Sequence, residues 1–96
     1  MATSPETALG LQSEHPLASP LQALLLEIVQ CLVDVPGQVR VSATEGDRTI
    51  ILNVTAAPLD VGKVIGKHGR IADALRIILN AAAGKHGKRV LLDLPT

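Results

Sequence analysis

The stretch that decides the fold is Val64-Ile65-Gly66-Lys67-His68-Gly69-Arg70, in which two glycines enclose a lysine and a histidine. Apolar segments with helical spacing lie on both sides of it, so we predict a tight turn between two helices. Glycines allow the backbone to turn sharply and to bring its N–H groups close to an anion. The unpaired N–H groups at the start of the second helix also favour negative charge. We therefore predict an anion-binding turn, and a nucleic-acid phosphate is the anion that suits it best.

Two helices are predicted to flank this turn. Pro58 opens a short helix over residues 59–65, with Asp60 in its first turn. A second helix covers residues 70–83 and is ended by Gly84. Its predicted apolar stripe consists of Ile71, Ala74, Leu75, Ile78, Ala81 and Ala82. Ile77 falls among the polar positions of this helix. Because Ala72 and Leu79 extend the apolar arc beyond one packing surface, the helix is either buried on two sides or partly exposed to a groove or a partner chain.

The N-terminal part of the chain predicts a tail followed by one helix. Residues 1–19 are rich in Ser, Thr, Pro and Glu and show no period, which is typical of a disordered tail. Ser19 as N-cap and Pro20 at the first helical position start a helix that runs to about residue 33. The apolar face predicted for it is Leu21, Leu24, Leu25, Ile28 and Leu32.

Three segments alternate apolar and polar side chains as half-buried strands do. Residues 38–44 and 48–56 are joined by the Glu45-Gly46-Asp47 turn into a hairpin, and residues 88–94 form a final strand. The predicted element order is therefore α-β-β-α-α-β. This is an α+β fold, and 96 residues are enough for one small domain with a single core.

Composition narrows the function further. No apolar run approaches the roughly 18 residues that span a membrane, and the N-terminus has no secretory pattern. The lone Cys31 cannot form a disulfide within the chain, so we expect a cytoplasmic protein without a membrane partner. The formal net charge is zero, but basic residues outnumber acidic ones from residue 61 onward.

The residues predict no catalytic, metal or cofactor site. A nucleotide-binding P-loop fails because Gly62 and Gly66 are separated by three residues and His68 follows the lysine where Ser or Thr is required. His15 and His86 lie in the tail and in another turn, too scattered for a metal centre. We therefore expect neither an enzyme nor a small-molecule substrate.

The tetrapeptide Gly-Lys-His-Gly occurs a second time at residues 84–87. This copy follows a helix and leads into a strand, so its glycines are expected to end the helix and to form a turn. We predict that only the first copy is a binding turn. Lys85, Lys88 and Arg89 leave two interpretations open, a solvated turn or a peripheral basic patch.

The stretch Ile65-Gly66-Lys67-His68-Gly69 between two helices resembles the GxxG loop of KH domains, and the element order is that of the type II (prokaryotic) KH arrangement. The run from Asp60 to Ala72 is similar to that of small, single-domain bacterial KH proteins of the KhpA type. The similarity covers residues 21–94. It implies a KH domain over residues 20–94, followed by a tail of residues 95–96, with a three-stranded sheet packed by helices on one face.

The resemblance implies that about four nucleotides of single-stranded RNA are held between the GxxG loop and an aliphatic groove. The residues expected to hold phosphates are Lys63, Gly66, Lys67, His68, Gly69 and Arg70. The residues expected to line the groove are Val64, Ile65, Ile71 and, from the second strand, Ile51. The chain has no Phe, Tyr or Trp, which excludes the aromatic platforms of other single-strand readers.

Two functions follow as alternatives from this resemblance. One is an RNA-binding post-transcriptional regulator or RNA chaperone. The other is a protein-interaction or assembly module, such as a dimerisation partner or ribosome-associated factor, with little RNA affinity of its own. The resemblance also implies a homodimer or a heterodimer with another KH protein, and Ile77 and Ile78 are the interface candidates.

Overall fold

A computed structural model describes residues 17–95 of the chain. The elements are α1 (Ala18–Leu32), β2 (Arg40–Glu45), β3 (Thr49–Thr55), α2 (Val61–Ile65), α3 (Arg70–Gly84) and β4 (Arg89–Asp93). Three single-turn 3-10 helices connect them: η2 (Pro36–Gln38), η3 (Pro58–Asp60) and η4 (Lys67–Gly69). The predicted order α-β-β-α-α-β is confirmed. Most of the predicted tail, residues 1–16, lies outside the described residues.

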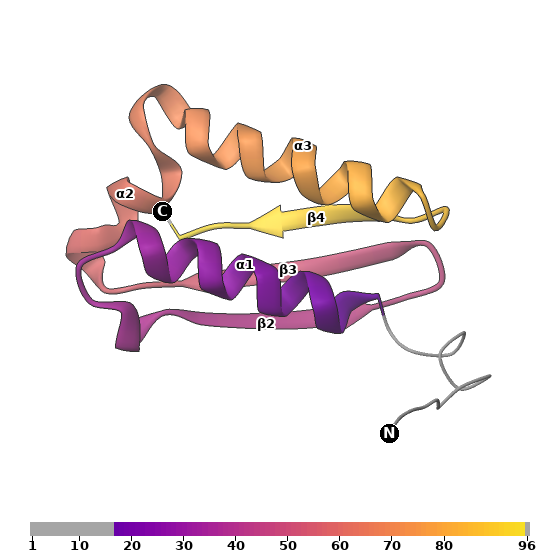
Figure 1. Cartoon of the computed structure of the whole chain (residues 1–96), viewed down its shortest axis with the longest axis horizontal. Helices are drawn as coiled ribbons and strands as arrows, with labels where there is room; N and C mark the ends of the chain where they lie inside the picture. The colour runs from indigo at the N-terminus through magenta and orange to yellow at the C-terminus, as the bar shows by residue number, and fades with distance from the viewer. Residues whose placement is uncertain (1–16, 96) are drawn as a thin grey trace, which may run out of the picture.

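The sheet has the strand order β2-β3-β4. β2 and β3 are antiparallel, as the predicted hairpin requires, whereas β3 and β4 are parallel. A parallel pair needs a crossover connection, and the segment containing α2 and α3 provides it. Helices α1 and α3 lie on the same face of the sheet, α1 over β2 and α3 over β4 (Figure 1). The predicted α+β architecture with helices on one face is therefore confirmed.

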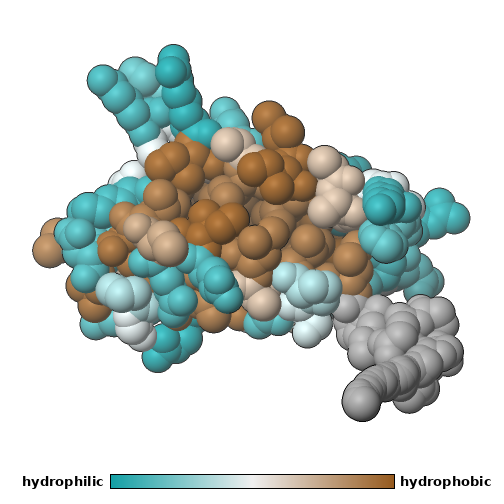
Figure 2. Space-filling view, in the orientation of Figure 1, coloured by the Kyte–Doolittle hydropathy of each residue, from teal (hydrophilic) through white to brown (hydrophobic). Residues whose placement is uncertain are grey.

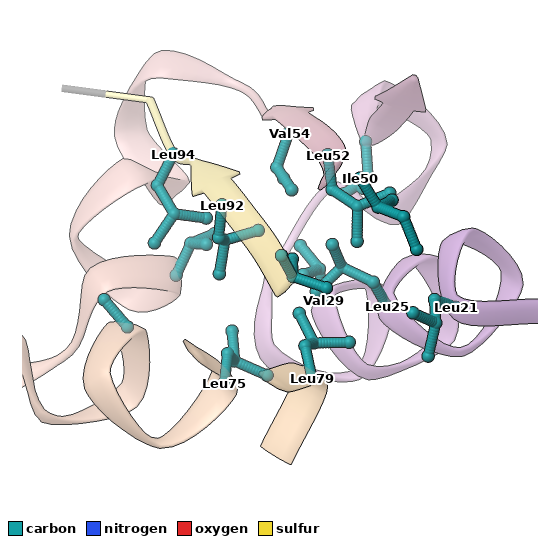
Figure 3. Packing of buried hydrophobic residues seen from close by; sticks show 14 of the residues in the cluster. Leu21, Leu25, Val29, Ile50, Leu52, Val54, Leu75, Leu79, Leu92 and Leu94 are labelled. Carbon is teal, nitrogen blue, oxygen red and sulfur yellow. The ribbon is translucent and has the colours of Figure 1, made fainter. Parts of the chain in front are cut away.

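Aliphatic side chains alone fill the core. The alternation of β3 and β4 directs Ile50, Leu52 and Val90 toward the helices, where they are almost completely buried. Leu25 of α1 and Leu79 of α3 meet them from the other side, and Figure 3 shows how the labelled side chains of both helices and the sheet converge. This single core sets the position of both long helices.

The rotation of α3 differs from the predicted one. Its buried residues are Ala72, Leu75, Leu79 and Ala83, whereas the predicted Ala74, Ile78, Ala81 and Ala82 are exposed. A polar contact accompanies this rotation, because Asn80 Oδ1 accepts the N–H of Val90 (2.8 Å) and its Nδ2 donates to the carbonyl of Val90 (3.1 Å). Since β4 is an edge strand, this amide satisfies backbone groups that face away from the sheet.

The start and the rotation of α1 also differ from the prediction. Leu21, Leu25 and Val29 are buried, but Leu24 is 46% exposed. The helix begins at Ala18, so Ser19 is not the N-cap, and no side chain of the first turn caps it. Instead, the Glu45 carboxylate at the end of β2 accepts the N–H of Ala18 at 2.9 Å through Oε1. A long-range acceptor therefore replaces the local cap.

Glu45 also links the hairpin to the turn between α3 and β4. Its second carboxylate oxygen is paired with Lys88 Nζ, and both side chains are largely buried. The hydrogen bond from Lys88 and the N–H of Ala18 lower the pKa of the Glu45 carboxyl from its ordinary value of 4.5, although burial acts in the opposite direction. A carboxyl group with a lowered pKa in the folded state stabilises the fold above its unfolded-state pKa.

This pairing predicts a pH-dependent stability difference between the wild type and Glu45→Gln. At pH 7 the variant is expected to be less stable by about 1 kcal/mol, because a charged acceptor at a helix start is lost. The difference should shrink as the pH falls below 4.5, through the lowered folded-state pKa, because the wild-type carboxylate then takes up a proton. Thermal unfolding followed by circular dichroism at pH 7 and pH 3 measures this, and an equal difference at both pH values would contradict it.

Candidate nucleic-acid interface

The Gly66-Lys67-His68-Gly69 segment, called the GxxG turn below, forms a tight connection between α2 and α3. Its backbone has positive φ at Gly66 (82°), His68 (58°) and Gly69 (73°). The N–H of Gly66 donates to the carbonyl of Gly62 (2.8 Å), and the N–H of Gly69 donates to the carbonyl of Gly66 (3.0 Å). The turn lies at one end of the molecule, where α3 begins (Figure 1). The predicted turn between two helices is confirmed.

The two glycines serve different physical purposes. A Cβ atom on Gly66 would lie 2.6 Å from Cγ1 of Ile71 and 2.9 Å from its backbone nitrogen, so Ile71 packs directly on the Gly66 backbone. A Cβ atom on Gly69 would meet no heavy atom within 4 Å. Gly66 is therefore needed for a close approach as well as for its φ angle, and Gly69 for its φ angle alone.

The backbone N–H groups at the tip of the turn are available to a ligand. Within residues 17–95, the N–H groups of Lys67 and His68 donate to no protein acceptor, whereas that of Arg70 donates to the carbonyl of Lys67. Of the four N–H groups predicted to hold phosphates, those of Gly66 and Gly69 already donate to backbone carbonyls, so only those of Lys67 and His68 remain available.

The basic side chains around the turn fall into two groups. Lys67, His68 and Arg70 are exposed, and no ion pair of the described residues includes Lys67 or Arg70. Figure 2 shows hydrophilic side chains projecting at the upper left, where Figure 1 places the turn. Lys63 differs, since its Nζ lies 3.4 Å from Asp34 Oδ2 and 3.6 Å from Asp60 Oδ1. Its charge is therefore already engaged by carboxylates.

Asp60 anchors α2 to the segment that follows α1. Asp60 is 1% exposed, and its carboxylate accepts the N–H of Asp34 (3.2 Å) and of Val35 (3.0 Å). Burial by itself raises the pKa of Asp60, but these N–H groups and the Lys63 ammonium outweigh it, so the pKa lies below its ordinary value of 3.8. The sequence predicted only an acidic residue in the first turn of a helix, and nothing in it marks the two distant N–H groups as partners.

Two residues that were predicted to line the groove, Val64 and Ile51, lie elsewhere in the structure. Val64 is fully buried in the core, so its side chain offers no surface to a base. Ile51 is 37% exposed but points to the face of the sheet opposite the helices, in register with Thr44 and Leu91. Side chains of β3 alternate between the two faces of the sheet, so Ile50 and Leu52, on either side of Ile51 in the chain, take the positions that face the helices.

The remaining predicted apolar residues do border the turn. Ile65, which ends α2, and Ile71, in the first turn of α3, are both partly buried and pack against the core. The GxxG turn lies between them in the chain. They are the aliphatic side chains that the structure places next to the available N–H groups.

The second Gly-Lys-His-Gly segment has the predicted structural role. The N–H of Lys88 donates to the carbonyl of Ala83 at 3.0 Å, and Gly87 has a φ of 74°. These features end α3 and turn the chain into β4.

No group of three His, Cys, Asp or Glu residues suited to a metal ion occurs in the part of the chain that the structure describes. No helix in that part is long and apolar enough to cross a membrane.

Comparison with known proteins assigns the family. The profile described as "KhpA/KhpB, KH domain" matches residues 22–94. The chain belongs to the KhpA/KhpB KH-domain family. The resemblance seen in the sequence is thereby confirmed, and the family is not one of enzymes. No solved structure matches the chain significantly.

Several curated relatives support the assignment. The "RNA-binding protein KhpA" of Clostridium acetobutylicum is 49% identical over 74 residues, which cover 77% of this chain and 99% of that protein. The protein of the same name from Aquifex aeolicus is 51% identical over 66% of this chain and 80% of its own length. That of Treponema pallidum is 47% identical over 76% of this chain and 91% of its own length.

The two glycines of the turn are expected to respond differently to alanine. Gly66→Ala should lower the free energy of unfolding by about 3 kcal/mol, because backbone strain is added to the displacement of Ile71. Gly69→Ala should cost only about 1 kcal/mol, for the left-handed backbone alone. Denaturant unfolding of both variants measures the difference, and equal costs would contradict the close contact between Gly66 and Ile71.

Proposed function

We propose that this chain binds single-stranded RNA and holds about four nucleotides at the GxxG turn. The observation that carries the proposal is the pair of unpaired N–H groups at Lys67 and His68, next to the exposed Lys67 and Arg70 side chains. A phosphate oxygen accepts from such donors and is attracted by both cations. The curated relatives, named as RNA-binding proteins, support the choice of RNA.

The turn supplies phosphate contacts, and the aliphatic neighbours supply contacts for the bases. Ile65 and Ile71 keep part of their surface exposed beside the turn. Lys63 contributes less than its neighbours, because Asp34 and Asp60 already neutralise it. The phosphate-binding set is therefore Lys67, His68 and Arg70 with the turn backbone, and the contact surface for bases is Ile65 and Ile71.

Such a site is weak and sensitive to salt. Each phosphate contact to a single strand contributes a slope of about −0.7 to the dependence of log affinity on log salt concentration. Two or three contacts are few, so pairing of two chains on one RNA would raise the affinity through effective concentration. A cytoplasmic post-transcriptional regulator or RNA chaperone would act through such a paired form.

An exposed apolar face of α3 favours pairing as a second function. Ile77 is 70% exposed and Ile78 is 52% exposed. Figure 2 shows that apolar surface extends along the face on which α1 and α3 lie. We assign this face to a homodimer or to a heterodimer with another KH protein. The pairing function and the RNA-binding function use different parts of α3.

RNA binding is tested by the double variant Lys67→Asp, His68→Asp with a degenerate five-nucleotide RNA. The loss of phosphate contacts should weaken binding at least tenfold in a fluorescence-anisotropy titration. The second Gly-Lys-His-Gly segment provides a matched control, because Lys85→Asp, His86→Asp makes the same substitutions in the same tetrapeptide. The control should bind this short RNA like the wild type. Equal affinity of all three proteins, each folded by circular dichroism, would contradict the proposal.

Pairing is tested by the molecular mass in solution. The wild type should sediment as a dimer at micromolar concentrations, and Ile77→Glu, Ile78→Glu should sediment as a monomer with unchanged helix content. Leu59→Glu is the control, because Leu59 is also an exposed apolar residue (91%) but lies in η3, before α2, and not on α3. A wild type that stays monomeric throughout the micromolar range would contradict the homodimer.

A further inference from the structure

The end of the molecule opposite the GxxG turn gathers three basic residues from separate segments. These residues, called the far basic end below, are Arg48, Lys85 and Arg89. The N–H of Arg89 donates to the carbonyl of Arg48 at 3.0 Å, which joins the hairpin loop to the start of β4. Figure 1 shows the hairpin and the turn between α3 and β4 meeting at this end. The fold thus places charges together that the sequence separates.

The far basic end is available to an anion. Arg48, Lys85 and Arg89 are exposed, and none belongs to an ion pair within residues 17–95. The neighbouring Lys88 is different, since it is paired with Glu45 and donates to the carbonyl of Gly46 (3.2 Å). Lys88 thereby neutralises Glu45, and Asp47 is the remaining acidic side chain of the hairpin loop. The surface keeps an excess of positive charge.

Helix α3 sets the distance between this surface and the GxxG turn. It has 15 residues, so at about 1.5 Å per residue it is roughly 22 Å long. Stacked nucleotides place their phosphates about 3.4 Å apart along one strand, so about six nucleotides span the helix. A segment of four nucleotides bound at the turn ends before the far basic end, whereas a longer strand reaches it.

We propose that the far basic end is a second phosphate-binding surface for the same RNA strand. Single strands longer than about ten nucleotides then contact the chain at both ends of α3, and shorter ones contact only the GxxG turn. This inference rests on the proposed RNA-binding function. Cations next to the C-terminal end of α3 also interact favourably with the carbonyls at the helix end. That role affects the stability of the fold and does not make the RNA affinity depend on the length of the RNA.

The test compares Arg48→Gln, Arg89→Gln with the wild type on degenerate RNAs of five and fifteen nucleotides. The variant should bind the fifteen-nucleotide RNA about fivefold more weakly at 0.15 M salt and the five-nucleotide RNA unchanged. Its salt slope on the longer RNA should be shallower by about 1.4, which corresponds to two lost contacts. A matched control, Gln38→Glu, Arg40→Gln, removes the same net charge at the other end of β2 and should bind both RNAs like the wild type.

The outcomes separate this inference from the proposed function. An unchanged affinity and slope on the longer RNA would overturn the second surface, as would equal weakening on both lengths. Failure of Lys67→Asp, His68→Asp to weaken five-nucleotide binding would instead overturn the GxxG site. If the Arg48→Gln, Arg89→Gln variant does not fold, Lys85→Gln, in the turn between α3 and β4, is compared with the wild type on the same two RNAs. Its salt slope on the fifteen-nucleotide RNA should be shallower by about 0.7, for one lost contact.

Discussion

The buried carboxylate of Asp60 is the contact on which the proposed binding site depends. Helix α2 has five residues, too few for a helix to be stable by itself. Its start is held by the hydrogen bonds from Asp34 and Val35 to Asp60, and its end by the packing of Ile71 on Gly66. The N–H groups of the GxxG turn are therefore directed by contacts outside the turn, and their geometry exists before any ligand arrives.

Ion pairing decides which charges of this neutral chain can act on a ligand. Lys63 and Lys88 hold elements together through Asp60 and Glu45, and Arg76 is paired with Asp73. Within residues 17–95, Arg40 at the start of β2 is in no ion pair, and the other unpaired cations lie near the two ends of α3, at the GxxG turn and at the far basic end. A net charge of zero therefore coexists with local positive surfaces, and the spacing of those surfaces follows from the length of one helix.

The element order and the turn could be predicted because local signals determine them. Alternation in the strands and the paired glycines act within a few residues. The rotation of α1 and α3 could not be predicted, because both helices carry apolar residues around most of their circumference. Contacts with the sheet and with the Asn80 amide determine which arc is buried. The burial of Val64 and the role of Asp60 could not be predicted for the same reason, since burial and hydrogen bonds to distant N–H groups depend on the tertiary structure.

The most direct test of this account is an NMR titration of the isotope-labelled chain with a five-nucleotide single-stranded RNA. The account predicts that the backbone amide resonances of Lys67 and His68 shift most, with Ile65 and Ile71 next and the outer face of the sheet unchanged. If those two amides stay in place while residues elsewhere shift, the GxxG turn is not the phosphate site.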